Sequence, residues 1–223
     1  MRETCLSFQI IFCRAFIRLA NEHFGTTNKE MHFSQVDFSA VALSPLQTNK
    51  GVKTSNATLA GAPCEFLLHP DDWFSCPFGA STFDRDPLAT RLTCEVDVTN
   101  SDVLQLLQQL DQWAIRAVVS HTLFEGMSAE DVARTYHPCL QSSEKYNTIR
   151  LRTKLNIAGL HACRFFKHPE RTPIEFKELD LRTCQIRPVI QLKGIWKQSG
   201  QWGLSLDLKK VLVDPQGTAT WDF

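Results

Sequence analysis

The chain has 223 residues, of which 43% are hydrophobic and 22% charged, and its 24 basic and 24 acidic residues give a formal net charge of zero. This length and composition fit one folded domain, or at most two, with enough apolar residues to bury a core. None of the eight cysteines forms a Cys-x-x-Cys pair, which excludes a zinc ribbon and a dithiol redox motif of that type. Scattered single cysteines favour buried thiols in a reducing, intracellular compartment, and a disulfide-bonded secreted protein is the alternative.

Residues 1–31 form an N-terminal extension whose role the sequence leaves open. An apolar stretch at 5–20 is interrupted by Arg14 and Arg18, too early for a transmembrane helix of about 20 residues. We therefore expect no membrane span. The spacing fits an organelle transit helix or a degraded secretory signal, and it also fits a disordered segment, an amphipathic helix packed on the domain, or a start site placed too far upstream.

The next part of the chain predicts a small antiparallel sheet. Residues 32–43, 64–69 and 91–98 have strand character, and the last of these alternates apolar and polar side chains like a half-buried strand. The Gly-, Asn-, Thr- and Lys-rich segment 48–61 predicts a mobile surface loop. Residues 71–87 are rich in turn residues and aromatics, which is typical of an irregular connection or of a plug over one end of the sheet.

Two helices are predicted between the strands. Apolar residues from Val103 to Val118 recur at helical spacing, and Ser101 can cap this helix. A shorter helix begins at Ser128, where Ser128 and Asp131 have the spacing of a capping box, and ends before Pro138. Because the helices do not alternate with strands, the pattern argues against a parallel doubly wound sheet, and the expected fold is mainly β with inserted helices.

Residues 148–156 predict the most basic strand. Side chains alternate along a strand, so Arg150, Arg152 and Lys154 share one face and the apolar residues share the other. Three cations about 7 Å apart approach the spacing of successive phosphates along an extended nucleic-acid strand, roughly 6 to 7 Å. This face therefore predicts a row that binds phosphates.

Residues 183–198 and 201–213 predict a long hairpin that turns at Ser199-Gly200. An uninterrupted register places on one face Ile190, Leu192, Trp196, Trp202, Leu204, Leu206 and Leu208. The opposite face carries the cations Arg187, Lys193 and Lys197, with Gln191, Ser205 and Asp207. The hairpin thus extends the basic face of the sheet.

Aromatic rings near these cations have two interpretations. Trp196 and Trp202 lie on the apolar side of the predicted hairpin, where they are either core residues or rings that stack on bases. Phe165 and Phe166 follow Arg164 and must point to opposite faces of a strand, so that one of them can stack on a base.

The net charge of zero conceals a segregation along the chain. Residues 61–141 contain 12 acidic and 4 basic residues, a net charge of −8, whereas residues 142–213 contain 14 basic and 6 acidic residues, a net charge of +8. Clustered cations of this kind predict a surface for a polyanion. The alternative is that the two halves neutralise each other across an internal interface.

Five segments carry a resemblance to a known family. In chain order they are CPFG followed by an acidic stretch, RLTCEVDV, LLQQLDQWAI, SAEDVARTYHPCLQSSEK leading into RLRTKLN, and IRPVIQLKGIWKQSGQWGLSLDLKKVLV. In order and character they resemble the single-stranded DNA-binding proteins of small lytic tailed phages and their relatives in large DNA viruses of algae and protists. The resemblance covers about four fifths of the chain, roughly residues 36–213.

The resemblance implies an OB-fold-like, five-stranded antiparallel barrel with a helical insertion, here over residues 32–213. Such proteins bind single-stranded DNA without sequence preference in replication, recombination or repair, and use no cofactor. The binding residues expected here are Arg150, Arg152, Lys154, Arg164, Phe165, Arg187, Lys193, Trp196, Lys197 and Trp202. The compartment implied is the nucleus or a viral replication site, or an organelle if the N-terminus is a targeting segment, and a homodimer is compatible with the sequence.

The family also implies a partner-binding tail. Residues 214–223 end in Trp221, Asp222 and Phe223, which resemble an aromatic, acidic terminus that recruits replication proteins. Only Asp214 and Asp222 are acidic, so this tail departs from the family pattern.

Two other functional classes compete with this prediction. The best candidates for an enzyme are the run His69-Pro70-Asp71-Asp72 and His161 with Cys163, and neither has the spacing of a known ligand set or catalytic group. We therefore expect no enzyme. The stronger alternative is a protein-interaction or structural module on a β-barrel that binds no nucleic acid.

Overall fold

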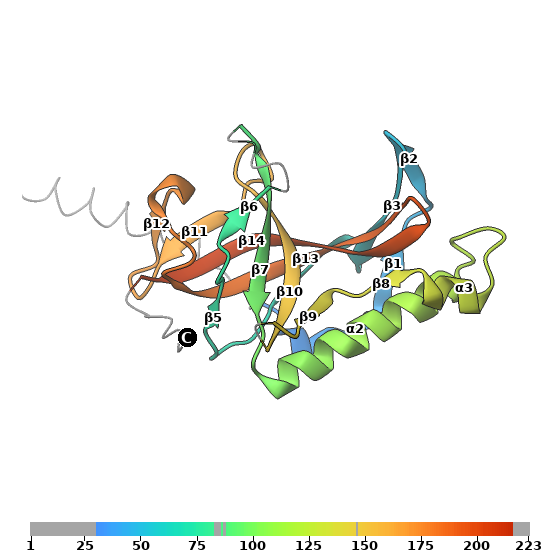
Figure 1. The fold of residues 1–223 in the computed structure, drawn as a ribbon, viewed down its shortest axis with the longest axis horizontal. Coiled ribbons are helices and arrows are strands. Elements are labelled where there is room, and N and C mark those ends of the chain that lie inside the picture. Colours follow the sequence, from blue (N-terminus) through green and yellow to red (C-terminus); the bar gives the residue numbers. More distant parts are fainter. Residues whose placement is uncertain (1–29, 83–85, 87, 146, 216–223) are drawn as a thin grey trace, which may run out of the picture. The chain divides into compact units, whose positions relative to one another are not determined.

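The computed structural model describes residues 30–82, 86, 88–145 and 147–215. From Met31 the chain forms one compact unit that is mainly β (Figure 1). Its strands are β1 (Val41–Leu43), β2 (Gln47–Asn49), β3 (Val52–Leu59), β4 (Ala62–Leu67), β5 (Phe74–Ser75), β6 (Ala80–Ser81), β7 (Arg91–Asp97), β8 (Tyr136–His137), β9 (Leu140–Ser143), β10 (Thr148–Asn156), β11 (Arg164–Lys167), β12 (Thr172–Ile174), β13 (Gln185–Gln198) and β14 (Gln201–Asp214). The helices are α2 (Ser101–Ser120), α3 (Ala129–Arg134) and three short 3₁₀ turns, Phe33–Gln35, Phe38–Ala40 and Phe176–Glu178. Among the described residues, no helix combines the length and apolar character needed to cross a membrane.

The strands form a single sheet that is larger than the expected five-stranded barrel. It has 14 strands, with the central order β1-β3-β4-β13-β14-β10-β7-β6. β5 pairs with β13 while β6 pairs with β7, so residues 74–81 close a ring through β13, β14, β10 and β7. Three strands, β8, β10 and β11, run parallel to β14. The prediction of a mainly β fold with inserted helices is confirmed. The sheet differs from the predicted five-stranded antiparallel barrel in having more strands and in containing parallel pairs.

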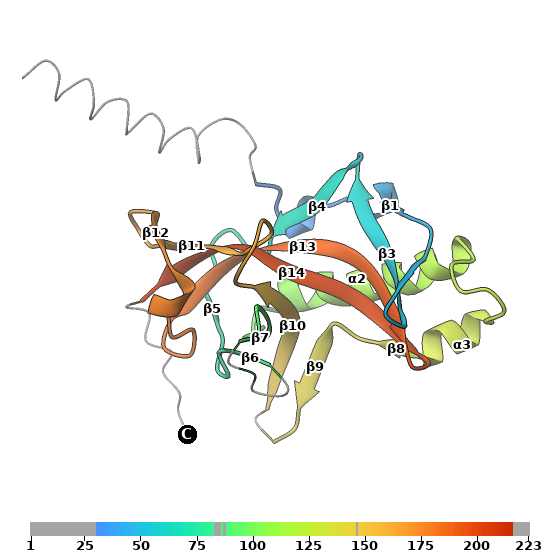
Figure 2. The ribbon, with the colours of Figure 1, turned by 90° about the horizontal axis from the view of Figure 1, so that it is seen from above.

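The long hairpin β13–β14 runs through the whole sheet (Figure 2). The predicted turn at Ser199 and Gly200 is confirmed, but the uninterrupted register is wrong. Leu192 pairs with Leu206 and Gly194 pairs with Ser205, so Lys193 is an extra residue in a β-bulge. A one-residue shift exchanges the two faces of a strand, and every side chain of β13 after the bulge is therefore reversed.

Two N-terminal expectations are wrong. Residues 33–40 form two 3₁₀ turns, the second capped by Asp37, whose side chain accepts the N–H of Ser39 at 2.9 Å. The segment predicted as a loop at 48–61 contains β3, which pairs with β13 through four residues and carries the buried Ala57 and Ser55 in its alternation. Pairing with a central strand thus overrides the turn-rich composition of this segment.

The helices are close to prediction. α2 is capped by Asn100, one residue before the expected Ser101, and the Asn100 side chain accepts the N–H groups of Asp102 and Val103. α3 begins at the predicted cap Ser128, which accepts the N–H of Asp131 at 3.1 Å. Both helices are inserted between β7 and β8.

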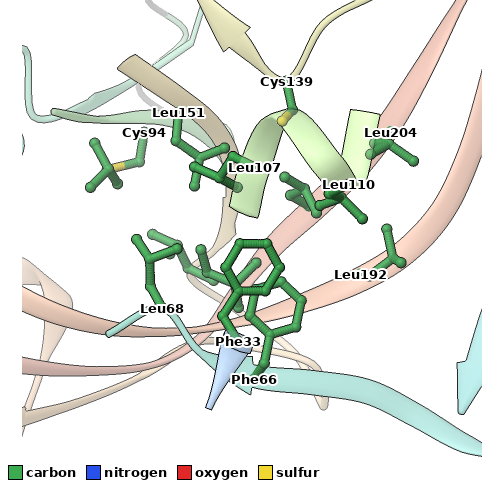
Figure 3. Packing of buried hydrophobic residues seen from close by; sticks show 14 of the residues in the cluster. Phe33, Phe66, Leu68, Cys94, Leu107, Leu110, Cys139, Leu151, Leu192 and Leu204 are labelled. Carbon is green, nitrogen blue, oxygen red and sulfur yellow. The ribbon is translucent and has the colours of Figure 1, made fainter. Parts of the chain in front are cut away.

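One core lies between the sheet and α2 (Figure 3). Phe33 and Phe66 stack with ring centroids 4.5 Å apart, and Leu107 and Leu110 of α2 lie above them. All six cysteines of the described residues are buried free thiols in or beside this core, and burial raises the pKa of Cys64 to about 11. The core defines two sides of the strands, and we call the side that points away from it the outer face.

Candidate nucleic-acid interface

The outer face is formed by β7, β10, β14 and β13. Register assigns to it Arg91, Thr93, Glu95 and Asp97 of β7, Arg150, Arg152, Lys154 and Asn156 of β10, Gly203, Ser205 and Asp207 of β14, and Gln191, Lys193 and Trp196 of β13. The opposite positions of β10, Leu151, Thr153 and Leu155, are fully buried. The predicted side for the three cations of β10 agrees with this register.

The first of these cations is largely neutralised by β7. Arg150 forms an ion pair with Glu95, its side chain is only 14% exposed, and its guanidinium lies 4.7 Å from the centroid of the Phe78 ring. Asp97 pairs directly opposite Arg150, and burial raises the pKa of this carboxyl while Arg150 lowers it. The positive charge of Arg150 is therefore largely compensated by its acidic neighbours, and Arg150 contributes little to phosphate binding.

Arg152 and Lys154 are more accessible to a ligand. Arg152 is exposed and stands opposite Glu95. Lys154 is half-buried, and its Nζ donates to the hydroxyl of Thr93 at 2.9 Å. Burial lowers the pKa of Lys154, and the neighbouring guanidinium of Arg152 lowers it further. Of the predicted row, Arg152 is the cation best placed to meet a phosphate.

The buried carboxylate of Asp207 contacts the polar side chains next to Lys154. Asp207 pairs opposite Lys154 and is 3% exposed. Its Oδ1 lies 3.5 Å from Nη2 of Arg91, and its Oδ2 accepts from the amide of Asn156 at 3.2 Å. Asp207 thus holds Arg91, whose side chain is 56% exposed, beside Lys154.

Trp196 lies on the outer face, contrary to the predicted register. It pairs with Gly203 of β14 and Thr54 of β3, while the adjacent Ile195 points into the core. Its indole N–H donates to the carbonyl of Leu204 at 3.1 Å, and the side chain is partly exposed. The bulge at Lys193 is the cause, because it moves Trp196 from the core side to the outer side.

The same bulge moves Lys197 the other way. Lys197 shares the face of Trp202, and its Nζ lies 4.2 Å from the centroid of the Phe124 ring, next to the sulfur of Met127. Desolvation lowers its pKa, with a smaller contribution from Lys53. Lys193 follows the inward-pointing Leu192, so it stays on the outer face, whereas Lys197 does not belong to it.

The remaining predicted cations lie toward the other end of the hairpin. Arg164 is exposed on β11, opposite Lys210 of β14. Arg187 stacks over Trp73, with its guanidinium 4.5 Å from the ring centroid, and donates to the carbonyl of Asp71 at 2.8 Å. Arg187 therefore anchors a loop and is not an open phosphate contact.

Two predicted aromatics have their rings inside the protein. Trp202 is fully buried, packs on Phe124 and Tyr136, and donates to the carbonyl of Val132 at 2.7 Å. Phe165 is 3% exposed and lies 5.6 Å from the ring of Phe176. The stacking role predicted for both rings does not fit these positions, and we leave them out of the interface. The tail residues Trp221, Asp222 and Phe223 lie outside the described residues.

Sequence reasoning missed the acidic side of this surface. Glu95 and Asp97 lie on one face of β7 with the cation Arg91, and this alternation is visible in RLTCEVDV. The pairing of β7 with β10 could not be predicted from the sequence. His137 was also missed, because β8 has only two residues and its pairing with β14 has no sequence signature.

The first enzyme candidate, the run from His69 to Asp72, forms a turn. The His69 ring accepts the N–H of Asp72 at 3.1 Å, which is the geometry of a turn. No group of three or more His, Cys, Asp or Glu residues in the described segments could hold a metal ion.

Comparison with known proteins gives matches to solved structures alone. No protein-family model and no curated protein matches the chain. It is similar to the single-stranded DNA-binding protein from bacteriophage Enc34 in complex with ssDNA, at 9% identity and a TM-score of 0.43 over 76% of this chain and 93% of that one. It is also similar to gp2.5, a single-stranded DNA-binding protein encoded by bacteriophage T7, at 11% identity and a TM-score of 0.40 over 73% and 91%.

Proposed function

We propose that this protein binds single-stranded DNA without sequence preference and acts without catalysis in DNA replication, recombination or repair, on an OB-fold-like sheet. The observation that carries the proposal is one surface, the outer face, on which the cations Arg152, Lys154 and Lys193 share a side of the sheet with the outward-turned ring of Trp196. Cations along a groove and a ring for base stacking are the two requirements of such binding.

The geometry favours a single strand over a duplex. Base stacking on Trp196 needs an unpaired base, because the faces of paired bases are covered by their neighbours. Ammonium and guanidinium groups bind any phosphate, and a ring face accepts any base, so no sequence preference is expected. Recruitment of replication proteins by Trp221, Asp222 and Phe223 belongs to the same proposal, as does action in the nucleus or at a viral replication site.

The carboxylates of the outer face limit its positive charge. Glu95, Asp97 and Asp207 lie among the cations, and Arg150 already has a partner. These carboxylates favour the second candidate, a protein-interaction module, in which acidic and basic groups of the sheet serve mainly each other.

A charge reversal at Arg152 separates the two candidates. Arg152→Glu replaces a positive charge by a negative one at the exposed centre of the outer face, and we expect it to weaken binding of a labelled 30-nucleotide oligo-dT about tenfold at low salt. The control is Arg116→Glu, which makes the same change at an exposed position of α2, on the core side of the hairpin. Fluorescence anisotropy measures both. Equal affinities for the two variants would contradict the assigned interface.

A further inference from the structure

We propose that the partly exposed ring of Trp196 is a base-stacking subsite with Gly203 as its floor and His137 as a second wall. This inference rests on the proposed function and deepens it, because it says where bases are held as opposed to phosphates. It is independent of the charges of β10, which would interact with the phosphates of the DNA and not with its bases.

The orientation of the Trp196 ring is fixed in the free protein. A Cβ added at Gly203 would lie 3.1 Å from Cζ2 and 3.2 Å from Cε2 of Trp196, so the indole lies against the backbone of Gly203. The bond from the indole N–H to the Leu204 carbonyl holds it there. The edge of the indole that carries Nε1, Cε2 and Cζ2 is thereby turned toward the backbone of Gly203 and Leu204. A ring held in its binding orientation loses little entropy when a base stacks on it.

His137 stands across Gly203 from Trp196. Gly203 pairs with Trp196 on one side and with His137 of β8 on the other, and the two rings lie 6.3 Å apart between centroids at an interplanar angle of 52°. A base between two parallel rings needs about 7 Å, two contact distances of roughly 3.5 Å. The tilted pair, which we call the wedge, is slightly narrower than this, so a base enters it only when the His137 ring swings away from Trp196.

The surroundings of the wedge are polar and without acid. The row of paired residues that runs through it is Gln47, Thr54, Trp196, Gly203 and His137. None of the five carries a carboxylate, in contrast to the β7 and β10 side of the outer face, where Glu95 and Asp97 stand. Gln47 and Thr54 can hydrogen-bond base edges of either kind, which suits binding without sequence preference.

The wedge lies within reach of the cations. Gly203 and Asp207 are four residues apart on β14, about 13 Å, and Asp207 stands beside Lys154. β10 pairs with β14 through Lys154 and Leu155, and before these residues the N–H of Arg152 donates to the carbonyl of Cys139, between β8 and β9. A strand that stacks one base on Trp196 therefore places a phosphate about two nucleotides away near Lys154, at roughly 6 to 7 Å per nucleotide.

The competing explanation is that Trp196 merely covers the backbone of Gly203. Such a cover would need apolar volume but no aromatic face. Trp196→Leu keeps much of the apolar volume and removes the ring, whereas Trp196→Tyr keeps a ring. The matched control is Trp73→Leu, since the face of Trp73 is occupied by the Arg187 guanidinium.

The test measures the affinity of the full chain for two labelled 20-nucleotide strands, oligo-dT and an abasic strand with the same phosphates and no bases. We expect Trp196→Leu to weaken binding of oligo-dT about five- to fiftyfold and to change binding of the abasic strand less than twofold. Trp196→Tyr and Trp73→Leu should each stay within about threefold of the unaltered chain on both strands.

Each outcome has a separate meaning. If Trp196→Leu weakens both strands equally, or weakens neither, the subsite is wrong, and the proposed function then rests on the cations of the outer face alone. If the unaltered chain does not bind oligo-dT at low salt, the proposed function itself fails. Should Trp196→Leu not fold, the fluorescence quenched by oligo-dT is compared between the unaltered chain and Trp196→Phe, and equal quenching in the two would overturn the subsite.

Discussion

Glu95 controls how much positive charge of β10 reaches solvent. It forms the ion pair with Arg150 and stands opposite Arg152 in the ladder between β7 and β10. A carboxylate at this position attracts both guanidinium groups and repels an approaching phosphate. The residue most unfavourable to DNA binding on this surface therefore lies at its centre.

Removal of this charge should strengthen DNA binding. Glu95→Gln keeps an oxygen that accepts a hydrogen bond from Arg150 but removes the repulsion, so we expect the affinity for oligo-dT to rise about three- to tenfold at low salt, which corresponds to roughly 1 kcal/mol. The dependence of affinity on salt should become steeper, since another cation is free to neutralise a phosphate. Anisotropy titrations at two salt concentrations measure both quantities.

The matched control for this change is Glu130→Gln. Glu130 is an exposed residue in the first turn of α3, and we expect its neutralisation to leave the affinity within twofold. An affinity unchanged or reduced by Glu95→Gln would show that the β7–β10 ladder does not face the DNA.

At the scale of the element, the bulge in β13 decides which side chains the hairpin presents. Gly194 follows the extra residue Lys193 at φ +137°, and a Cβ built on it would lie 1.8 Å from the carbonyl oxygen of Ser55. The backbone of β3 therefore approaches β13 at a position that tolerates no side chain. This approach fixes the bulge, and the bulge turns Trp196 outward.

Gly194→Ala should destabilise the fold more than an alanine at another glycine of positive φ. We expect a loss of at least about 3 kcal/mol, because the added Cβ combines an unfavourable φ with a backbone clash that β3 can relieve only by moving away. For a unit of this size the loss lowers the melting temperature by roughly 6 to 12 °C. Thermal unfolding followed by circular dichroism measures it.

Gly200→Ala provides the comparison. Gly200 lies in the hairpin turn at φ +80° with no atom within 4 Å of the added Cβ, so the strain alone should cost about 1 kcal/mol. A similar melting temperature for both variants would mean that β3 does not press on Gly194 as described.

The strands that could be predicted are those with a clear period of two. The bounds 148–156 of β10 are confirmed, β7 ends one residue early, and the turn of the hairpin is where Ser199-Gly200 predicts it. Side-chain alternation alone gave the correct faces for Arg150, Arg152 and Lys154. The faces of Trp196 and Lys197 could not be predicted in this way, since the bulge at Lys193 shifts the register by one residue and lies beside β3, a strand distant in the sequence.

At the scale of the whole molecule, the segregation of charge has a structural explanation. β7 from the acidic half of the chain pairs with β10 from the basic half through seven residue pairs. The two halves therefore neutralise each other in part, as in the Glu95–Arg150 pair, and leave Arg152, Lys193 and Arg164 toward solvent. The sequence offered two explanations of the charge segregation, a surface for a polyanion and neutralisation across an internal interface. The structure contains features of both.

The most direct test of the central claim is the salt dependence of binding to single-stranded DNA. Anisotropy of a labelled 30-nucleotide oligo-dT is followed with the full chain between about 20 and 200 mM salt, with and without an unlabelled duplex of the same length. We predict tight binding at low salt, a linear fall of log affinity with log salt that indicates about two to four displaced counterions, and little competition by the duplex. An absence of binding at low salt, or equal displacement by duplex, would contradict the account.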